Sequence, residues 1–258
     1  GITLVGNNPS EIAFTRDVIA DDFLVLQGTV RAELYSISIH GDLTIQAGVV
    51  FQPGLINLVG AQDQNVSAAG LTLKDLTLNK PGNSQVTLLS PLNIAGILSV
   101  ASENTRFNTD GFLTLLSSSD APGGTARVGS LTGGSSISGE VTYQRYMSGE
   151  GKIYRYLSSP VVNATVASLL DDFPITGTFE DPSSGPGINS AAPSFFLYDE
   201  SRGTLQEGWQ SYPVSGLAIE NPLEVGRGYA AFIRNGTGAT VWDVKGLLNQ
   251  GDISLPVN

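Results

Sequence analysis

Apolar and polar residues alternate in short runs along the first half of the chain. Clear examples lie at residues 35–39, 71–78 and 85–89, with Gly, Asn, Asp and Pro between the runs. A period of two residues is typical of strands that bury one face, and the intervening residues favour turns. No amphipathic helical stretch of ordinary length interrupts this pattern. We therefore predict short β-strands throughout residues 1–135.

Segments in this half recur at a spacing of about 54 residues. Residues 2–6 read ITLVG and residues 56–60 read INLVG, and residues 39–45 match residues 94–100 with a similar offset. Asp22 and Asp75 open similar apolar runs. Strand-forming segments at a fixed spacing are typical of solenoids. We predict an N-terminal parallel β-helix, or β-solenoid, over residues 1–135, built from two repeats of about 54 residues, each with three coils of about 18 residues.

The second half has a different pattern of residues. Small residues mark a boundary at 121–124 (APGG) and 133–136 (GGSS), after which aromatic runs begin at 143–146 and 154–157. Residues 180–193 combine Pro, Gly and Ser and are expected to form a loop. Strand-like runs return at 195–198, 228–233 and 240–244. We predict a mainly antiparallel β-sandwich over residues 136–258 that continues in the parent chain, so the fold class is all-β.

Charge and composition exclude several classes of protein. The 258 residues carry a net charge of −11 without any cluster of Lys and Arg, which disfavours binding to nucleic acid. No apolar run is long enough for insertion into a membrane. Cysteine is absent, so disulfides cannot stabilise the fold.

The sequence offers little for catalysis. His40 is the only histidine, and its counterpart in the second repeat is Ala95, which indicates a surface position. Solenoid enzymes that cleave polysaccharides use paired carboxylates, and the candidates here are Asp21, Asp22, Asp42, Asp75 and Asp110. The equivalent positions of Asp22 and Asp75 favour a recurring turn instead. We predict no catalytic residue and no enzyme, although an active site in the solenoid stays a third alternative.

Two groups of residues in the second half are candidates for binding. Calcium prefers several oxygen ligands, and it is the one cofactor that the sequence leaves open. Its candidate ligands, for which turn and capping roles are the favoured alternative, are Asp171, Asp172, Glu180, Asp181, Asp199 and Glu200. Aromatic rings stack on sugar faces, and Trp209 and Tyr212 in an apparent loop are the candidate ligand contacts. Most other aromatic residues of this half are expected to face the core, namely Tyr143, Tyr146, Tyr154, Tyr156, Tyr229 and Trp242.

Several segments share apolar runs, turns and Leu-Thr-Leu units, namely residues 71–79 (LTLKDLTLN), 91–100 (PLNIAGILSV) and 107–115 (FNTDGFLTL), and they are followed by residues 156–161 (YLSSPV) and 226–230 (GRGYA). Together these segments resemble the repetitive regions of large adhesin-like proteins that Bacteroidetes-type bacteria export through the type IX secretion system. The resemblance implies secretion and an extracellular or cell-surface location. The sorting domain expected at the end of such proteins is not recognisable in residues 251–257, so export is inferred for the parent protein.

Together these observations favour a non-catalytic structural and adhesive segment of a secreted or cell-surface protein. It would act as a rod and display module, with extracellular glycans or surface components and neighbouring domains of the same polypeptide as its partners. The alternative is a carbohydrate-binding accessory module of an extracellular polysaccharide-degrading enzyme.

Overall fold

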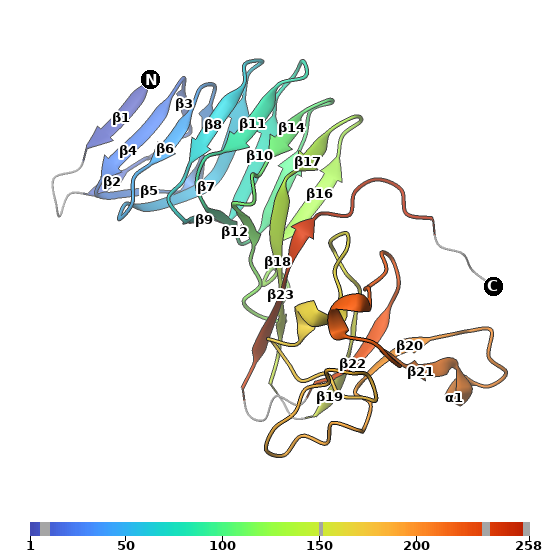
Figure 1. The fold of residues 1–258 in the computed structure, drawn as a ribbon. Helices are drawn as coiled ribbons and strands as arrows, with labels where there is room; N and C mark the ends of the chain where they lie inside the picture. The colour runs from blue at the N-terminus through green and yellow to red at the C-terminus, as the bar shows by residue number, and fades with distance from the viewer. Residues whose placement is uncertain (6–10, 150–151, 234–237, 255–258) are drawn as a thin grey trace. The chain divides into compact units, whose positions relative to one another are not determined.

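The computed structural model describes residues 1–5, 11–149, 152–233 and 238–254. Strands dominate these residues, and the few helices are single turns, so the predicted all-β class is confirmed (Figure 1). The chain divides into two compact units, Gly1–Thr142 and Tyr143–Asn258. The first is a parallel β-solenoid of about five turns, as the sequence predicts, and further sheets follow it.

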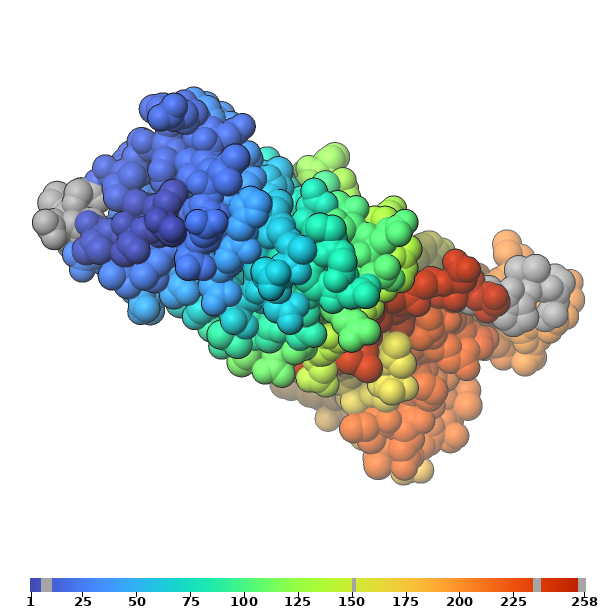
Figure 2. Space-filling view, turned by 90° about the horizontal axis from the view of Figure 1, so that it is seen from above, coloured from blue at the N-terminus to red at the C-terminus, as the bar shows by residue number. Residues whose placement is uncertain are grey.

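The solenoid coils around three faces, which we call A, B and C. Face A contains β1 (Ile2–Val5), β4 (Phe23–Gln27), β6 (Leu43–Ile45), β8 (Gln64–Ser67), β11 (Gln85–Leu88), β14 (Arg106–Asn108) and β17 (Ser136–Ser138). Face B contains β2 (Glu11–Ala13), β3 (Val18–Ala20), β5 (Thr29–Ile39), β7 (Val50–Val59), β10 (Asp75–Asn79), β13 (Ile97–Val100) and β16 (Arg127–Leu131). Face C contains β9 (Leu71–Leu73), β12 (Leu92–Ile94) and β15 (Leu113–Leu115). Figure 2 shows the coils following one another in chain order.

Strand pairing gives the length of one coil of the solenoid. Leu92 pairs with Leu71 on one side and with Leu113 on the other, and Ile2 pairs with Phe23. These paired residues are 21 positions apart in the chain. The spacing varies between coils, since Glu11 pairs with Thr29, 18 positions further on, and Ile97 pairs with Arg127, 30 positions further on. The predicted coil length of about 18 residues therefore holds at some pairings and is exceeded at most, whereas the predicted parallel stacking is confirmed.

The spacing of the matched sequence segments does not correspond to a whole number of coils. The first matched segment lies in β1 on face A, and the second lies in β7 on face B. Two coils account for most of the spacing, and the remaining fraction of a coil displaces the match by one face. The coil, and not the longer sequence repeat, is the unit that stacks.

A recurring corner explains why the segments that follow Asp22 and Asp75 look alike. Asp22 Oδ1 accepts a hydrogen bond from the N–H of Asp42 in the next coil at 2.9 Å, and Asp75 Oδ1 accepts one from the N–H of Ile97 at 2.6 Å. The residue before each donor is a glycine, Gly41 or Gly96. These carboxylates therefore have the turn role that their recurrence indicated.

The two glycines are required by the close approach of the preceding coil. A Cβ at Gly41 would lie 2.9 Å from the carbonyl oxygen of Asp21, and a Cβ at Gly96 would lie 2.5 Å from that of Lys74. Such contacts are shorter than van der Waals separation and would force the corner apart. Other corners use a carboxylate in the same way, with Asp17, Asp42 and Asp63 accepting from the N–H groups of Ser36, Asn65 and Gln85.

Apolar side chains fill the inside of the coils, and a buried lysine accompanies them. Phe23, Leu43 and Phe107 on face A are all at most 1% exposed. Lys80 is also fully buried, and its Nζ donates to Gln64 Oε1 at 2.7 Å and to the carbonyl of Val59 at 3.2 Å. Burial lowers the pKa of Lys80 to about 8. The polar groups at this corner satisfy one another across neighbouring coils.

The small-residue segments that suggested a domain boundary lie inside the first unit. Residues 121–124 belong to a loop closed by an antiparallel bridge between Ser117 and Thr125. Residues 133–136 lead into β17, which pairs with β14 on face A. The first unit thus continues to Thr142, past the boundary at 135 that the sequence suggested.

The second unit packs an antiparallel sheet against other strands and turns. The strand β18 (Glu140–Met147) begins in the first unit and ends in the second. The other elements are β19 (Ile153–Leu157), η1 (Val166–Leu169), β20 (Phe195–Tyr198), α1 (Leu205–Gly208), β21 (Trp209–Ser211), η2 (Ala218–Glu220), β22 (Tyr229–Ile233) and β23 (Thr240–Leu247). The sheet has the order β19-β22-β20-β21, and β23 pairs with β18. Phe195, Tyr229 and Trp242 belong to its buried core. The prediction that Tyr229 and Trp242 face the core is therefore confirmed. In the described residues, no helix has the length and apolarity needed to cross a membrane.

The corner geometry predicts that Gly96→Ala destabilises the solenoid by about 1–3 kcal/mol, because the new methyl group meets the backbone of the preceding coil. Gly133→Ala is the matched control, since a Cβ there meets no atom within 4 Å. Thermal denaturation followed by circular dichroism should show a lower Tm for Gly96→Ala alone. Equal Tm values for the two variants would contradict this account of the corner.

Candidate ligand-binding face

The outer surface of sheet β19-β22-β20-β21 is rich in aromatic side chains. Side chains alternate between the two sides of a strand, so Tyr154 and Tyr156 point away from the core that Leu157 enters. Their exposed fractions are 52% and 76%. The expectation that these two tyrosines face the core is therefore wrong.

The neighbouring strands extend this surface. Cross-strand pairing places Phe232 beside Tyr154, and Ala230 between Tyr156 and Phe196. We call the outward rings the aromatic face; they are Tyr154, Tyr156, Phe196, Tyr198, Trp209 and Phe232.

The rings of the aromatic face contact one another across the sheet. The centroids of Tyr154 and Phe232 are 4.9 Å apart. Tyr156 and Trp209 have centroids 6.2 Å apart and ring planes inclined by 25°. Because β22 and β20 separate their strands, by roughly 14 Å between backbones, these two side chains must lean toward each other above Ala230.

Four of these rings line a cleft. It has a volume of about 330 Å³ and is lined by Tyr154, Tyr156, Phe196, Trp209 and Ala230. Ala230 is the one small side chain among the five, and it leaves room that a larger outward residue would fill. We call this the aromatic cleft.

A glycine helps to position Trp209. Gly208 precedes it, and a Cβ at Gly208 would meet the ring of Tyr198, with its Cζ at 2.7 Å. The absence of a side chain lets the Tyr198 ring lie against this backbone, where it contacts Trp209 edge-on with centroids 5.0 Å apart. The Gly-Trp pair in the sequence is the local signal for this packing.

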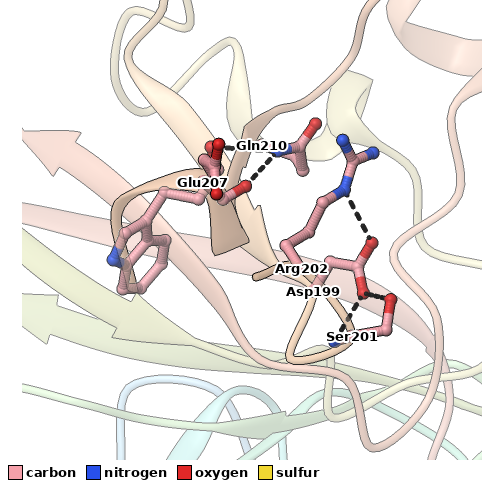
Figure 3. Close-up of polar contacts among 6 residues, drawn as sticks. Asp199, Ser201, Arg202, Glu207 and Gln210 are labelled. Carbon is pink, nitrogen blue, oxygen red and sulfur yellow. Dashed lines mark hydrogen bonds and ion pairs between the residues drawn. The ribbon is translucent and has the colours of Figure 1, made fainter. Parts of the chain in front are cut away.

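The hairpin formed by β20 and β21, residues 195–211, carries Trp209 and also presents polar side chains (Figure 3). Asp199 accepts hydrogen bonds from the hydroxyl of Ser201 at 2.6 Å and from Nε of Arg202 at 3.2 Å. These bonds, led by that from Ser201, lower the pKa of Asp199. Gln210 Nε2 donates to the carbonyl of Glu207 at 2.6 Å. The hairpin thus holds amide, guanidinium and carboxylate groups in a fixed arrangement.

Trp209 and Tyr212 are not brought together on one surface. The Tyr212 ring packs toward the core, with centroids 6.3 Å from Phe195 and 5.6 Å from Tyr229. Its hydroxyl donates to the carbonyl of Pro222 at 2.6 Å, and burial raises its pKa to about 12. Of this candidate pair, only Trp209 lies on the aromatic face.

The six candidate calcium ligands are also dispersed. Asp172 Oδ2 accepts from the N–H of Asp243 at 2.8 Å, and Asp181 Oδ1 accepts from that of Ala218 at 2.6 Å, at the start of η2. Asp199 belongs to the hairpin, next to exposed Glu200, while Asp171 and Glu180 are exposed. In the part of the chain that the structure describes, no three His, Cys, Asp or Glu residues are grouped so that they could hold a metal ion.

Asp172 provides a pH-dependent contribution to stability that can be measured. Burial raises its pKa to about 6, and in the unfolded chain it returns to an ordinary value near 4. The folded state therefore binds this proton more tightly, and the resulting stabilisation is present below about pH 4 and lost as the pH rises through 6.

We predict that Asp172→Asn raises the stability at pH 7 by on the order of 1 kcal/mol, after allowance for solvent screening, because the amide oxygen still accepts from Asp243 without a charge. The gain should disappear near pH 4. Chemical denaturation at both pH values measures it, with exposed Glu180→Gln as the control. A gain that is equal at both pH values would refute the assignment.

Comparison with protein-family models, curated proteins and solved structures found no match for this chain.

Proposed function

We propose that this chain is a non-catalytic rod and display segment of a secreted or cell-surface bacterial protein, and that its aromatic face is an adhesive surface. The parent protein would be of the adhesin-like kind exported by the type IX secretion system, and its location extracellular. Its partners would be glycans or other surface components, together with neighbouring domains of the same polypeptide.

The single observation that carries this proposal is the exposure of Tyr154, Tyr156 and Trp209 above one cleft. Exposed aromatic side chains grouped in this way are costly in water and are enriched where proteins bind partners. The inner side of the same sheet already supplies the core, so the outer rings are not needed to seal it.

The solenoid supports the rod part of the proposal. Its strands pair in parallel along each face, and corner carboxylates bind the backbone of the next coil. This periodic bonding makes a stiff spacer without disulfides. The carboxylates that a solenoid enzyme would use for catalysis, Asp22, Asp42 and Asp75, are engaged as hydrogen-bond acceptors, which supports a non-catalytic role.

An accessory module of an extracellular polysaccharide-degrading enzyme is the second candidate. The aromatic cleft favours it equally, since such a module also holds a glycan. The two differ in what the parent chain contains, because an enzyme requires a separate catalytic domain.

Adhesion of coated beads tests the proposal. Beads carrying the chain should adhere to at least one surface in a panel of neutral polysaccharides, acidic polysaccharides and extracellular proteins. The double variant Tyr156→Ala, Trp209→Ala should reduce adhesion about tenfold. As a matched control, Ile19→Ala with Leu34→Ala removes two exposed apolar side chains from the solenoid. Adhesion to no surface, or equal adhesion by both double variants, would contradict the proposal.

A further inference from the structure

We infer that the aromatic cleft binds an uncharged polysaccharide with a flat, ribbon-like chain, built from pyranose rings with equatorial substituents. This inference rests on the proposed function, because it names the ligand of the same adhesive face.

The ring geometry indicates how the ligand lies. The Tyr156 and Trp209 rings are close to parallel, with centroids 6.2 Å apart. A flat group inserted between them would need about 3.5–4 Å on each side, which is more than this separation allows. A ligand ring must therefore lie across the aromatic face, over the cleft, and not between the two rings.

This arrangement favours a sugar chain over a proline-rich peptide. Such peptides dock prolines into grooves between aromatic rings, and the slot between Tyr156 and Trp209 is too narrow for that. Pyranoses with equatorial substituents instead present broad faces of C–H groups, which are attracted to the negative faces of aromatic rings. Their hydroxyls project from the edges, in the plane of the ring.

Polar groups on the aromatic face can meet those hydroxyls. Tyr154 and Tyr156 are exposed, and their phenolic hydroxyls can each donate and accept a hydrogen bond. Gln210 follows Trp209 in β21 and pairs with Leu197, so alternation turns it to the other side of the sheet, away from the cleft.

The charges around the aromatic cleft favour an uncharged ligand. Arg202 is paired with Asp199, and the hairpin also carries Glu200 and Glu207, so its surroundings have no positive excess. The whole chain has a net charge of −11. This negative charge would repel acidic polysaccharides and anionic membranes, whereas it would not repel an uncharged glycan.

The test is isothermal titration calorimetry of the full chain with four soluble probes. They are cellohexaose as the flat neutral chain, maltohexaose as the coiled neutral chain, oligogalacturonate as the acidic chain, and a proline-rich decapeptide. We expect cellohexaose to bind best, with an affinity that is the same at about 0.05 and 0.5 M salt, because no net charge is neutralised.

Variants then assign the binding to the cleft. Tyr156→Ala and Trp209→Ala should each weaken cellohexaose binding about tenfold or more. Tyr156→Phe should retain most of the affinity, because it keeps the ring. Leu34→Ala is the control on the solenoid. Tyr156 is 76% exposed, so its replacement leaves the core intact, and circular dichroism verifies folding.

Each result separates this inference from the proposed function. Preference for oligogalacturonate, maltohexaose or the peptide, with loss in Tyr156→Ala, would overturn the ligand class and leave the adhesive face standing. Cellohexaose binding that survives both alanine variants would overturn the site and the function together. Binding to none of the four probes would overturn the ligand class, while the bead assay still decides whether the face is adhesive.

Discussion

The corner between coils is the constraint on which the solenoid depends. At every corner the chain must turn while its backbone N–H groups stay paired and the next coil stays within hydrogen-bonding distance. A carboxylate from one coil accepts the N–H of the next, as Asp75 does for Ile97. A glycine at the turn lets the two backbones approach, as Gly96 does against Lys74. Because each coil is held by the one before it, the apolar interior can be sealed without disulfides.

The second unit uses small residues for a different purpose. Ala230 and Gly208 are placed so that the rings around them can lean and pack, which leaves a cleft instead of a filled surface. The inner and outer sides of one sheet thus have separate roles. Phe195 and Tyr229 stabilise the core through stacked rings with centroids 5.2 Å apart, whereas Tyr156 and Trp209 face outward. The outer rings can therefore stay exposed while the inner rings keep the core packed.

Polar groups in both units illustrate how burial decides the behaviour of a side chain. Lys80 is enclosed by the coils and bonds to Gln64, and its pKa falls to about 8. Asp172 is partly enclosed in the second unit, and its pKa rises to about 6. Both shifts have desolvation as their largest cause. The corner acids, which are exposed or partly buried, instead act as hydrogen-bond acceptors for the next coil.

Period-two alternation and the placement of Gly and Asp determined, from the sequence alone, that the chain is all-β and that Asp22 and Asp75 are turn residues. These features are local, because strand and turn preferences act over a few residues. The solenoid in the first half was predicted from the recurrence of strand-like segments, which shows in the sequence because successive coils repeat the same strand and turn preferences. The length of a coil was decided only by tertiary stacking, since the segments that match in sequence lie on different faces. The aromatic cleft likewise could not be predicted from the sequence. Alternation shows that Tyr154 and Tyr156 share one side of a strand, but only the packing of the sheet against its core decides which side meets water.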